Sequence, residues 1–418
     1  ALARRDVLDA LDSLVVKSLV VPVSRDGAVW YRLLETMRVY AAEKLAQAGE
    51  VAAVRRRHLG WYRGFVDEAG IELIGPVSDA WVARLRPLAA DLGDLLTTHL
   101  AGVTATEREA GIDFMEAAWW IVGECMSQGK LVAIGKAAIG RLDTRDMVER
   151  RPMLCWMVGS ALRHQGQGAE ALPYLQAAAE VFLSRGNLRM ASWAMQNIAG
   201  SLLWIGDLDG AQTNYQRAVA IKHDLGNPLD LSYAISQLGE VARLRGDHAA
   251  AAASNRDALS LLSAEERRSS ASGWALHNLA QALLHLGELS EARKVLAELL
   301  SNPEIETLKP AVLSALPAAA RLAVSDGNQR SAAVLLGAAE RGLHDLHVIG
   351  EAPLDPPDRR DWDWHAATIR AALSPAELAS ALADGRALSD EASLALAREI
   401  LSWSSSVAEV ESESAGNG

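Results

Sequence analysis

In the middle of the chain, an amide side chain and an aromatic side chain recur together at one spacing. The amide stands nine residues before a glycine and the aromatic residue thirteen residues before it, in three successive segments. The six residues are Trp193, Asn197, Tyr233, Gln237, Trp274 and Asn278. Because an amide offers both donors and an acceptor, a row of amides can pair with the backbone of an extended peptide. The pattern indicates recognition of a ligand rather than catalysis.

The glycines that define this spacing belong to a longer repeat, which predicts pairs of helices. Each glycine follows an apolar-periodic segment, as expected for the left-handed residue that ends a helix. An alanine stands five positions later, where a small side chain lets two antiparallel helices approach closely. The glycines recur every 40 or 41 residues, at Gly166, Gly206, Gly246, Gly287 and Gly327. Single pairs cannot bury their apolar faces, so we expect five stacked pairs over residues 152–343.

The composition narrows the class of protein. Half of the 418 residues are hydrophobic but only 5% are aromatic, and alanine and leucine dominate, which is typical of an all-α fold. A net charge of −12 argues against a general nucleic-acid surface, because such a surface needs a basic field. The two cysteines, Cys125 and Cys155, indicate buried thiols in a reducing cytoplasm. No apolar stretch is long enough to span a membrane.

The N-terminal region differs from the rest of the chain. Residues 19–45, "LVVPVSRDGAVWYRLLETMRVYAAEKL", predict two short strands around a turn and then a helix. With the helix before them, they form the second half of a winged helix. That first helix carries three basic residues against three aspartates, and the hairpin offers only Arg25 beside Asp26. We therefore expect no direct nucleic-acid binding by this chain.

The repeat resembles the tetratricopeptide repeat, in a longer variant. The family's pattern of a large residue, Leu, and Gly or Ala in the first helix is matched three times. The matches are Met195-Ile198-Ala199, Ile235-Leu238-Gly239 and Leu276-Leu279-Ala280. The resemblance implies a right-handed superhelix with a concave groove lined by the first helices. It also implies that positions 13, 10, 9, 6, 3 and 2 before each glycine face this groove, which adds Glu240, Arg243, His277 and Gln281 to the candidate ligand-binding residues and places Arg163 and His285 on the same face.

Both ends of the chain resemble a second group of proteins. "SLVVKSLV", "YRLLETMRVYAAEKL" and "APLDPPDR" are similar to segments of actinobacterial signal-transducing ATPases with numerous domains. That group includes LuxR-type and antibiotic-regulator-type transcription factors. One departure is Val16, where the family pattern has an aspartate. The resemblance implies that the winged helix is a regulatory brace against an ATPase module.

The expected organisation has five parts. They are a partial winged-helix segment (1–50), connecting helices with a degenerate first repeat (51–151), five repeats (152–343), capping helices (344–408) and a disordered tail (409–418). The chain begins inside a helix pattern without an initiator methionine, so we expect a piece of a longer protein whose ATPase module is missing. No phosphate-binding loop, metal-ligand spacing or nucleophile motif occurs, and we expect no enzyme activity, cofactor or metal.

Two hypotheses for function stay open. In the first, the chain is the sensor arm of a cytoplasmic ATPase-type transcriptional regulator and binds a protein, peptide or small-molecule effector in its groove. In the second, it is a structural or oligomerisation scaffold that mediates protein–protein contacts, including those of a homo-oligomer. The candidate groove residues divide in the same way. Ligand-binding amides should be exposed in the free chain, whereas amides and aromatics that serve helix packing should be buried.

Overall fold

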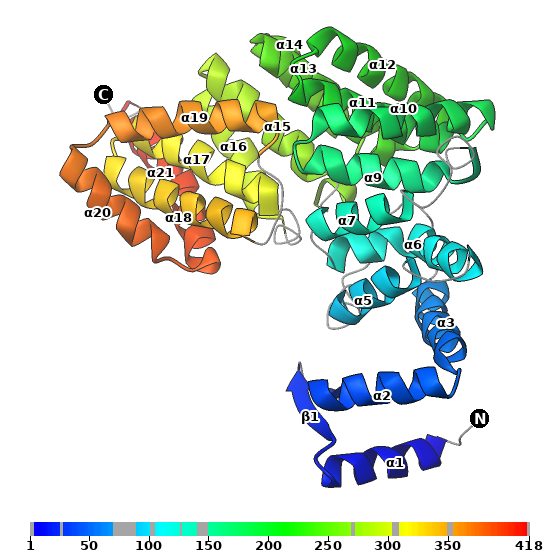
Figure 1. Ribbon diagram of the computed structural model, residues 1–418. Helices are drawn as coiled ribbons and strands as arrows, with labels where there is room; N and C mark the ends of the chain where they lie inside the picture. The colour runs from blue at the N-terminus through cyan, green and yellow to red at the C-terminus, as the bar shows by residue number, and fades with distance from the viewer. Residues whose placement is uncertain are drawn as a thin grey trace. The chain divides into compact units, whose positions relative to one another are not determined.

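The computed structural model describes residues 4–25, 28–69, 89–100, 105–125, 128–139, 149–268, 272–302, 309–348 and 354–415 (Figure 1). Helices dominate, as the composition predicts. The chain divides into two compact units, Ala1–Met126 and Ser127–Gly418. Within the described ranges, no helix is both long and apolar enough to cross a membrane. The same ranges hold no group of three or more His, Cys, Asp or Glu residues that could bind a metal ion.

The first unit begins with the predicted hairpin between two helices. The elements are α1 (Arg4–Val16), β1 (Val20–Arg25), β2 (Ala28–Leu33) and α2 (Glu35–Gln47). The strands pair antiparallel from Val20 opposite Leu33 to Arg25 opposite Ala28. This order confirms the expected helix, strand, strand, helix arrangement. The turn at Asp26 and Gly27 lies outside the described residues.

The hairpin and α2 leave much of their apolar surface uncovered. None of the thirteen residues of α2 is buried. Val39 and Tyr40 on α2 are 49% and 54% exposed, and Val29 on β2 is 61% exposed. A small core forms further along, where α3 (Val51–Ala69), α5 (Ala89–Leu100) and α6 (Ala105–Cys125) bury Leu96, Tyr62 and Phe114.

The second unit contains α7 (Gln128–Ile139) and then five antiparallel helix pairs. The pairs are α9/α10 (Pro152–His164, Gly168–Ser184), α11/α12 (Leu188–Trp204, Leu208–Leu225), α13/α14 (Pro228–Arg245, His248–Ser260), α15/α16 (Gly273–Leu286, Leu289–Leu300) and α17/α18 (Lys309–Ser325, Gln329–Val348). A 3₁₀ turn, η2 (Glu266–Arg268), precedes α15. The prediction of five stacked pairs is confirmed.

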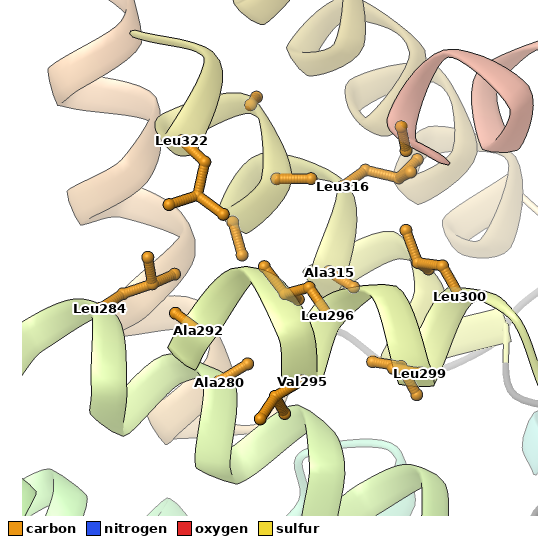
Figure 2. Packing of buried hydrophobic residues seen from close by; sticks show 14 of the residues in the cluster. Ala280, Leu284, Ala292, Val295, Leu296, Leu299, Leu300, Ala315, Leu316 and Leu322 are labelled. Atoms are coloured by element: carbon orange, nitrogen blue, oxygen red, sulfur yellow. The ribbon is translucent and has the colours of Figure 1, made fainter. Parts of the chain in front are cut away.

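The repeat register rests on glycine and alanine. All five register glycines lie between the two helices of a pair, with φ between 75° and 82°, a conformation that residues with a Cβ rarely adopt. The five alanines that follow them are fully buried, so the paired helices approach closely. Figure 2 shows the packing around α15–α17, where Ala280, Ala292, Leu296 and Leu316 belong to one buried hydrophobic cluster.

Three helices follow the array: α19 (Pro356–Ala371), α20 (Pro375–Arg386) and α21 (Asp390–Ala415). Helix α20 caps the last repeat by packing on α18. The contact is so close that a Cβ on Gly385 would collide with the Val334 carbonyl, and one on Gly337 with the Leu382 carbonyl. Helix α19 does not stay at the end of the array, but extends across the first helices of earlier repeats.

The C-terminal tail differs from the expectation. Helix α21 continues to Ala415, through most of the range 409–418 for which the sequence suggested disorder. The physical reason is local, because Ala and Glu are strong helix formers and no glycine or proline interrupts the chain before Gly416. Residues 416–418 lie outside the described range.

Candidate functional site

The predicted groove residues lie together on the first helices, but they are not exposed. Asn197, Gln237 and Asn278 are only 7%, 6% and 1% exposed. Their burial matches the alternative in which the amides serve helix packing, and not the one in which they are exposed for a ligand. A side chain of a neighbouring repeat contacts Gln237, and α19 lies against the polar network that contains Asn278. The contacts described below show whether a neighbouring repeat or α19 surrounds each side chain.

Around Gln237, the neighbouring repeat does the packing. The Gln196 Nε2 donates to Gln237 Oε1 at 3.1 Å, and Gln237 Nε2 donates to the Tyr233 hydroxyl at 2.9 Å. The Trp193 and Tyr233 rings lie 5.8 Å apart, and the Lys222 ammonium sits 3.7 Å above the Trp193 ring. Burial raises the pKa of Tyr233 to about 12. These aromatics serve interhelical packing, as one of the two interpretations predicted.

Arg243, on α13, is the centre of a buried polar network that α19 completes. Its guanidinium donates to Asp361 at 2.5 Å and to Asp358 at 2.8 Å, both on α19. It also donates to the amide oxygen of Asn278 at 3.0 Å. Arg243 and both aspartates are almost completely inaccessible to water. One cation of the array, Arg243, thus binds two carboxylates of α19.

Asn278 and Glu240 form the array side of this network. The Asn278 Nδ2 donates to Glu240 Oε1 at 3.3 Å and to the Ser236 hydroxyl at 3.1 Å. Burial is the dominant influence on Glu240 and raises its pKa to about 8, although the nearby Arg243 opposes this. Glu240 therefore holds a proton at neutral pH, which leaves Arg243 to the carboxylates of α19.

Two histidines of α15 extend the site along the helix. His277 Nε2 lies 3.1 Å from Asp358 Oδ1, and His285 Nε2 lies 2.8 Å from Asp361 Oδ1. Burial alone would raise the pKa of Asp358, but His277 and Arg243 outweigh it and hold that pKa far below its usual range. Arg243 and His285 lower the pKa of Asp361 against burial in the same way. Both aspartates are ionised at neutral pH. Trp274 packs edge-on against His277, with ring centroids 6.2 Å apart.

A stack of flat groups lies beside these ion pairs. The His248 and His285 rings are 4.1 Å apart and nearly parallel, and Trp364 of α19 stacks on the other face of His285 at 3.8 Å. The Arg321 guanidinium of α17 lies 3.6 Å from the centre of the Trp364 ring. The ring of Trp364 is thus held between a histidine and a cation.

Two further contacts involve the middle of α19 and its N-cap residue. His365 Nε2 lies 2.7 Å from Gln281 Oε1, and burial, its largest influence, lowers the pKa of His365 to about 3. The neutral imidazole therefore donates its Nε2 hydrogen to the amide oxygen. At the N-cap, Arg163 of α9 donates to Asp355 at 3.1 Å. The helix is contacted by side chains of α9, α13, α15 and α17.

One helix pair of the array matches a known repeat family. Residues 273–301, which contain α15 and α16, match the tetratricopeptide repeat. The array is a tetratricopeptide-repeat solenoid. Solenoids of this kind present a surface built by successive repeats and act as protein-interaction scaffolds.

Relatives among characterised sequences match only a short part of the solenoid chain. Proteins of Mycobacterium bovis and Mycobacterium tuberculosis, named as HTH-type transcriptional regulators, are 55% identical over 56 residues. These residues are 13% of this chain and 6% of each relative, so the chain matches a small fraction of their length. The expected resemblance to transcriptional regulators is confirmed over that segment.

Two solved structures resemble the chain over a greater length. One is a Rap protein complexed with competence and sporulation factor, at 14% identity and a TM-score of 0.46, covering 73% of this chain and 84% of that one. The other is a signal transduction ATPase with numerous domains and a tetratricopeptide repeat sensor, from Pyrococcus horikoshii. It is 15% identical with a TM-score of 0.43, covering 94% of this chain and 60% of that one.

Sequence reasoning missed the acidic side of the site. Asp355, Asp358 and Asp361 stand three residues apart in "DPPDRRD", so they share one face of a helix. This spacing, together with Arg163, Arg243 and two histidines on the predicted groove face, was a signal of charge complementarity. It could not have been decisive, because the sequence does not say whether α19 caps the end of the array or enters its inner face.

Proposed function

We propose that this chain is the sensor arm of a cytoplasmic, ATPase-type transcriptional regulator, and that its first helices bind a peptide or protein effector. One observation carries the proposal. The face formed by α9, α13, α15 and α17 binds α19 through hydrogen bonds, ion pairs and ring stacking. The 55% identity of one segment to proteins named as transcriptional regulators supports the regulatory context.

The proposed arm acts by changing a conformational equilibrium. An effector that binds one arrangement of the arm more tightly than another shifts the population toward that arrangement. The effect reaches the rest of the regulator only if the two arrangements differ in their contacts to it. A differential affinity of tenfold corresponds to about 1.4 kcal/mol of coupling.

Selection of peptides on the purified chain tests this proposal. A phage-displayed library of random 16-residue peptides is panned against the immobilised chain, and the recovered peptides are synthesised. Hydrogen exchange of each complex then maps the binding surface. The proposal predicts a related set of sequences that protect amides of α9, α13, α15 and α17. It is wrong if no sequence family is enriched, or if every binder protects only other surfaces.

A scaffold role is the second candidate, and one observation favours it. Val29, Val39 and Tyr40 are exposed on the hairpin and α2. Covering these apolar side chains with another surface would lower the free energy. Light scattering of the chain over a concentration series tests this role. A dimer that dissociates when Val39 and Tyr40 are both changed to Ser supports assembly through this face, and a monomer at all concentrations excludes it.

A further inference from the structure

Helix α19 has two halves that contact the array by different chemistry. Ala366 and Ile369, in its second half, belong to the hydrophobic core that includes α17, as does Trp362 directly after Asp361. Its first turns, from Asp355 to Asp361, meet the array chiefly through carboxylates. A buried ion pair is weak evidence for stability, because the cost of removing two charges from water offsets most of their attraction. The first half is therefore built for specific recognition of charge.

The array offers more hydrogen-bond donors at this face than α19 accepts. Two arginines that bind these aspartates, Arg163 and Arg243, each keep a buried Nε donor that has no acceptor among the residues that the structure describes. A buried donor without an acceptor is unfavourable, because it has lost its hydrogen bonds to water. A ligand richer in acceptors than α19 would remove that cost.

The contacts that hold the end of the array do not depend on the first half of α19. Helix α20 begins at Pro375 after its own capping box, formed by Ser374 and Glu377. Its close packing on α18 through Gly337 and Gly385 anchors the C-terminal region. The first turns of α19 can leave the groove while α20 remains in place.

We propose that Arg163, Arg243, His277 and His285 form a binding site for an acidic segment, which α19 occupies with its own Asp355, Asp358 and Asp361 until an effector displaces it. The proposal rests on the function proposed above and specifies the effector's chemistry. The effector is an acidic peptide or protein segment, helical over its contact, with carboxylates three residues apart. An aromatic residue three positions after the last carboxylate would take the place of Trp364 between His285 and Arg321. Arg243 selects carboxylates because its planar guanidinium binds two oxygens at once.

A labelled copy of α19 is the probe for this site. The peptide LDPPDRRDWDWHAATIRA, residues 354–371 with fluorescein at its N-terminus, is titrated with the full chain and followed by fluorescence anisotropy. In the wild-type chain, the tethered α19 competes at an effective concentration on the order of millimolar. The Asp358→Asn/Asp361→Asn chain has lost the charges that hold its own helix. We expect it to bind the peptide at least tenfold more tightly than the wild-type chain does.

Two controls separate charge recognition from loosened packing. Asp363→Asn changes a carboxylate on the exposed side of α19, where it pairs with the exposed Arg359, and should leave the affinity at the wild-type value. A peptide carrying Asn at positions 358 and 361 should bind the double variant at least tenfold more weakly than the acidic peptide. If both peptides bind alike, or if neither chain prefers the acidic one, the carboxylate site does not exist.

A second measurement needs no variant and covers the case in which the double variant does not fold. The wild-type chain is incubated with about 1 mM acidic peptide, which matches the effective concentration of the tether, and hydrogen exchange is followed. Exchange at residues 354–362 should rise at least tenfold while α20 keeps its protection. Unchanged exchange at 354–362 overturns the proposal.

Failure of this inference and failure of the proposed function give different results. If panned peptides protect the first helices but lack acidic residues and do not compete with the labelled α19 peptide, the sensor function stands and the acidic site does not. If the labelled peptide binds as expected but panning yields no binder at the inner face, the site is an internal contact and the effector proposal fails.

Discussion

The hairpin region exposes apolar side chains to water, whereas the repeat array buries charged ones. In the α1–α2 region, Val39 and Tyr40 remain exposed although burial would favour them. In the array, Arg243 and Asp361 are almost fully buried although hydration would favour them. The difference follows from what each region finds to pack against. A two-stranded hairpin with two helices encloses little volume, whereas stacked pairs and α19 enclose a continuous core.

The contrast indicates where each region gets its stability. The array and the helices that follow it share one hydrophobic core, and Arg243 of the array pairs with two aspartates of α19. The hairpin region has good local structure but few buried side chains, so little of its stability comes from tertiary packing. Substitutions at buried charges of the array should therefore cost much more than substitutions of exposed apolar residues near the N-terminus.

The largest expected effect is the loss of the buried cation. Arg243→Met leaves Asp358 and Asp361 without their shared counter-ion inside the protein. Breaking a buried pair in this way typically costs about 3–5 kcal/mol. We expect that decrease in the free energy of unfolding, measured by urea denaturation with far-UV circular dichroism.

The matched control for that change is Arg359→Met, which removes an exposed arginine whose partner, Asp363, is also exposed. It should alter the free energy of unfolding by less than about 0.5 kcal/mol. Equal effects of the two substitutions would mean that water reaches the carboxylates facing Arg243, and the contrast between the two regions would then disappear.

The pH dependence of stability should show the buried carboxyl of Glu240. Its pKa is raised from 4.5 to about 8, so the folded state holds a proton that the unfolded state has already lost, and stability falls as pH rises from 4.5 to 8. His365, whose pKa is lowered from 6.5 to about 3, contributes stability that is lost as pH falls below 6.5. Between pH 6.5 and 8 the Glu240 effect amounts to about 2 kcal/mol, and near pH 8 it is partly opposed by Lys222, whose pKa burial lowers to about 8.

Urea denaturation at pH 6.5, 7.25 and 8 measures this loss. Glu240→Gln keeps an oxygen that can accept from Asn278 but cannot ionise, so the variant should keep nearly constant stability over the same range. A wild-type chain that is equally stable at all three values would show that Glu240 is ionised in the folded protein, and the proton assignment would be wrong.

The smallest expected effect is in the hairpin region. Tyr40→Ser on α2 removes an exposed ring and should change the free energy of unfolding by less than about 0.5 kcal/mol. Thermal and urea unfolding of the purified chain at low micromolar concentration provide the measurement. A loss above about 1 kcal/mol would show that another surface covers Tyr40 in solution.

The repeat architecture could be predicted from sequence because its determinants are local. A glycine in the left-handed conformation and an alanine five positions later act within a few residues of each other, as Gly246 and Ala251 do. Their regular recurrence then placed five helix pairs without any knowledge of tertiary contacts. The hairpin was predictable for the same reason, since strand pairing across a short turn is a contact between neighbours in sequence.

By itself, the sequence also determined which side chains share the inner face, because position in a repeat sets the direction of a side chain on its helix. It did not determine whether that face is open. Asn278 and Arg243 are buried because Asp358 and Asp361, more than 100 residues away from Arg243, lie against them. Such a contact depends on the path of α19 after the last repeat, and helix periodicity carries no information about that path. Only the tertiary structure decided that α19 of the same chain lies against the predicted groove face, with its aspartates bound to Arg243.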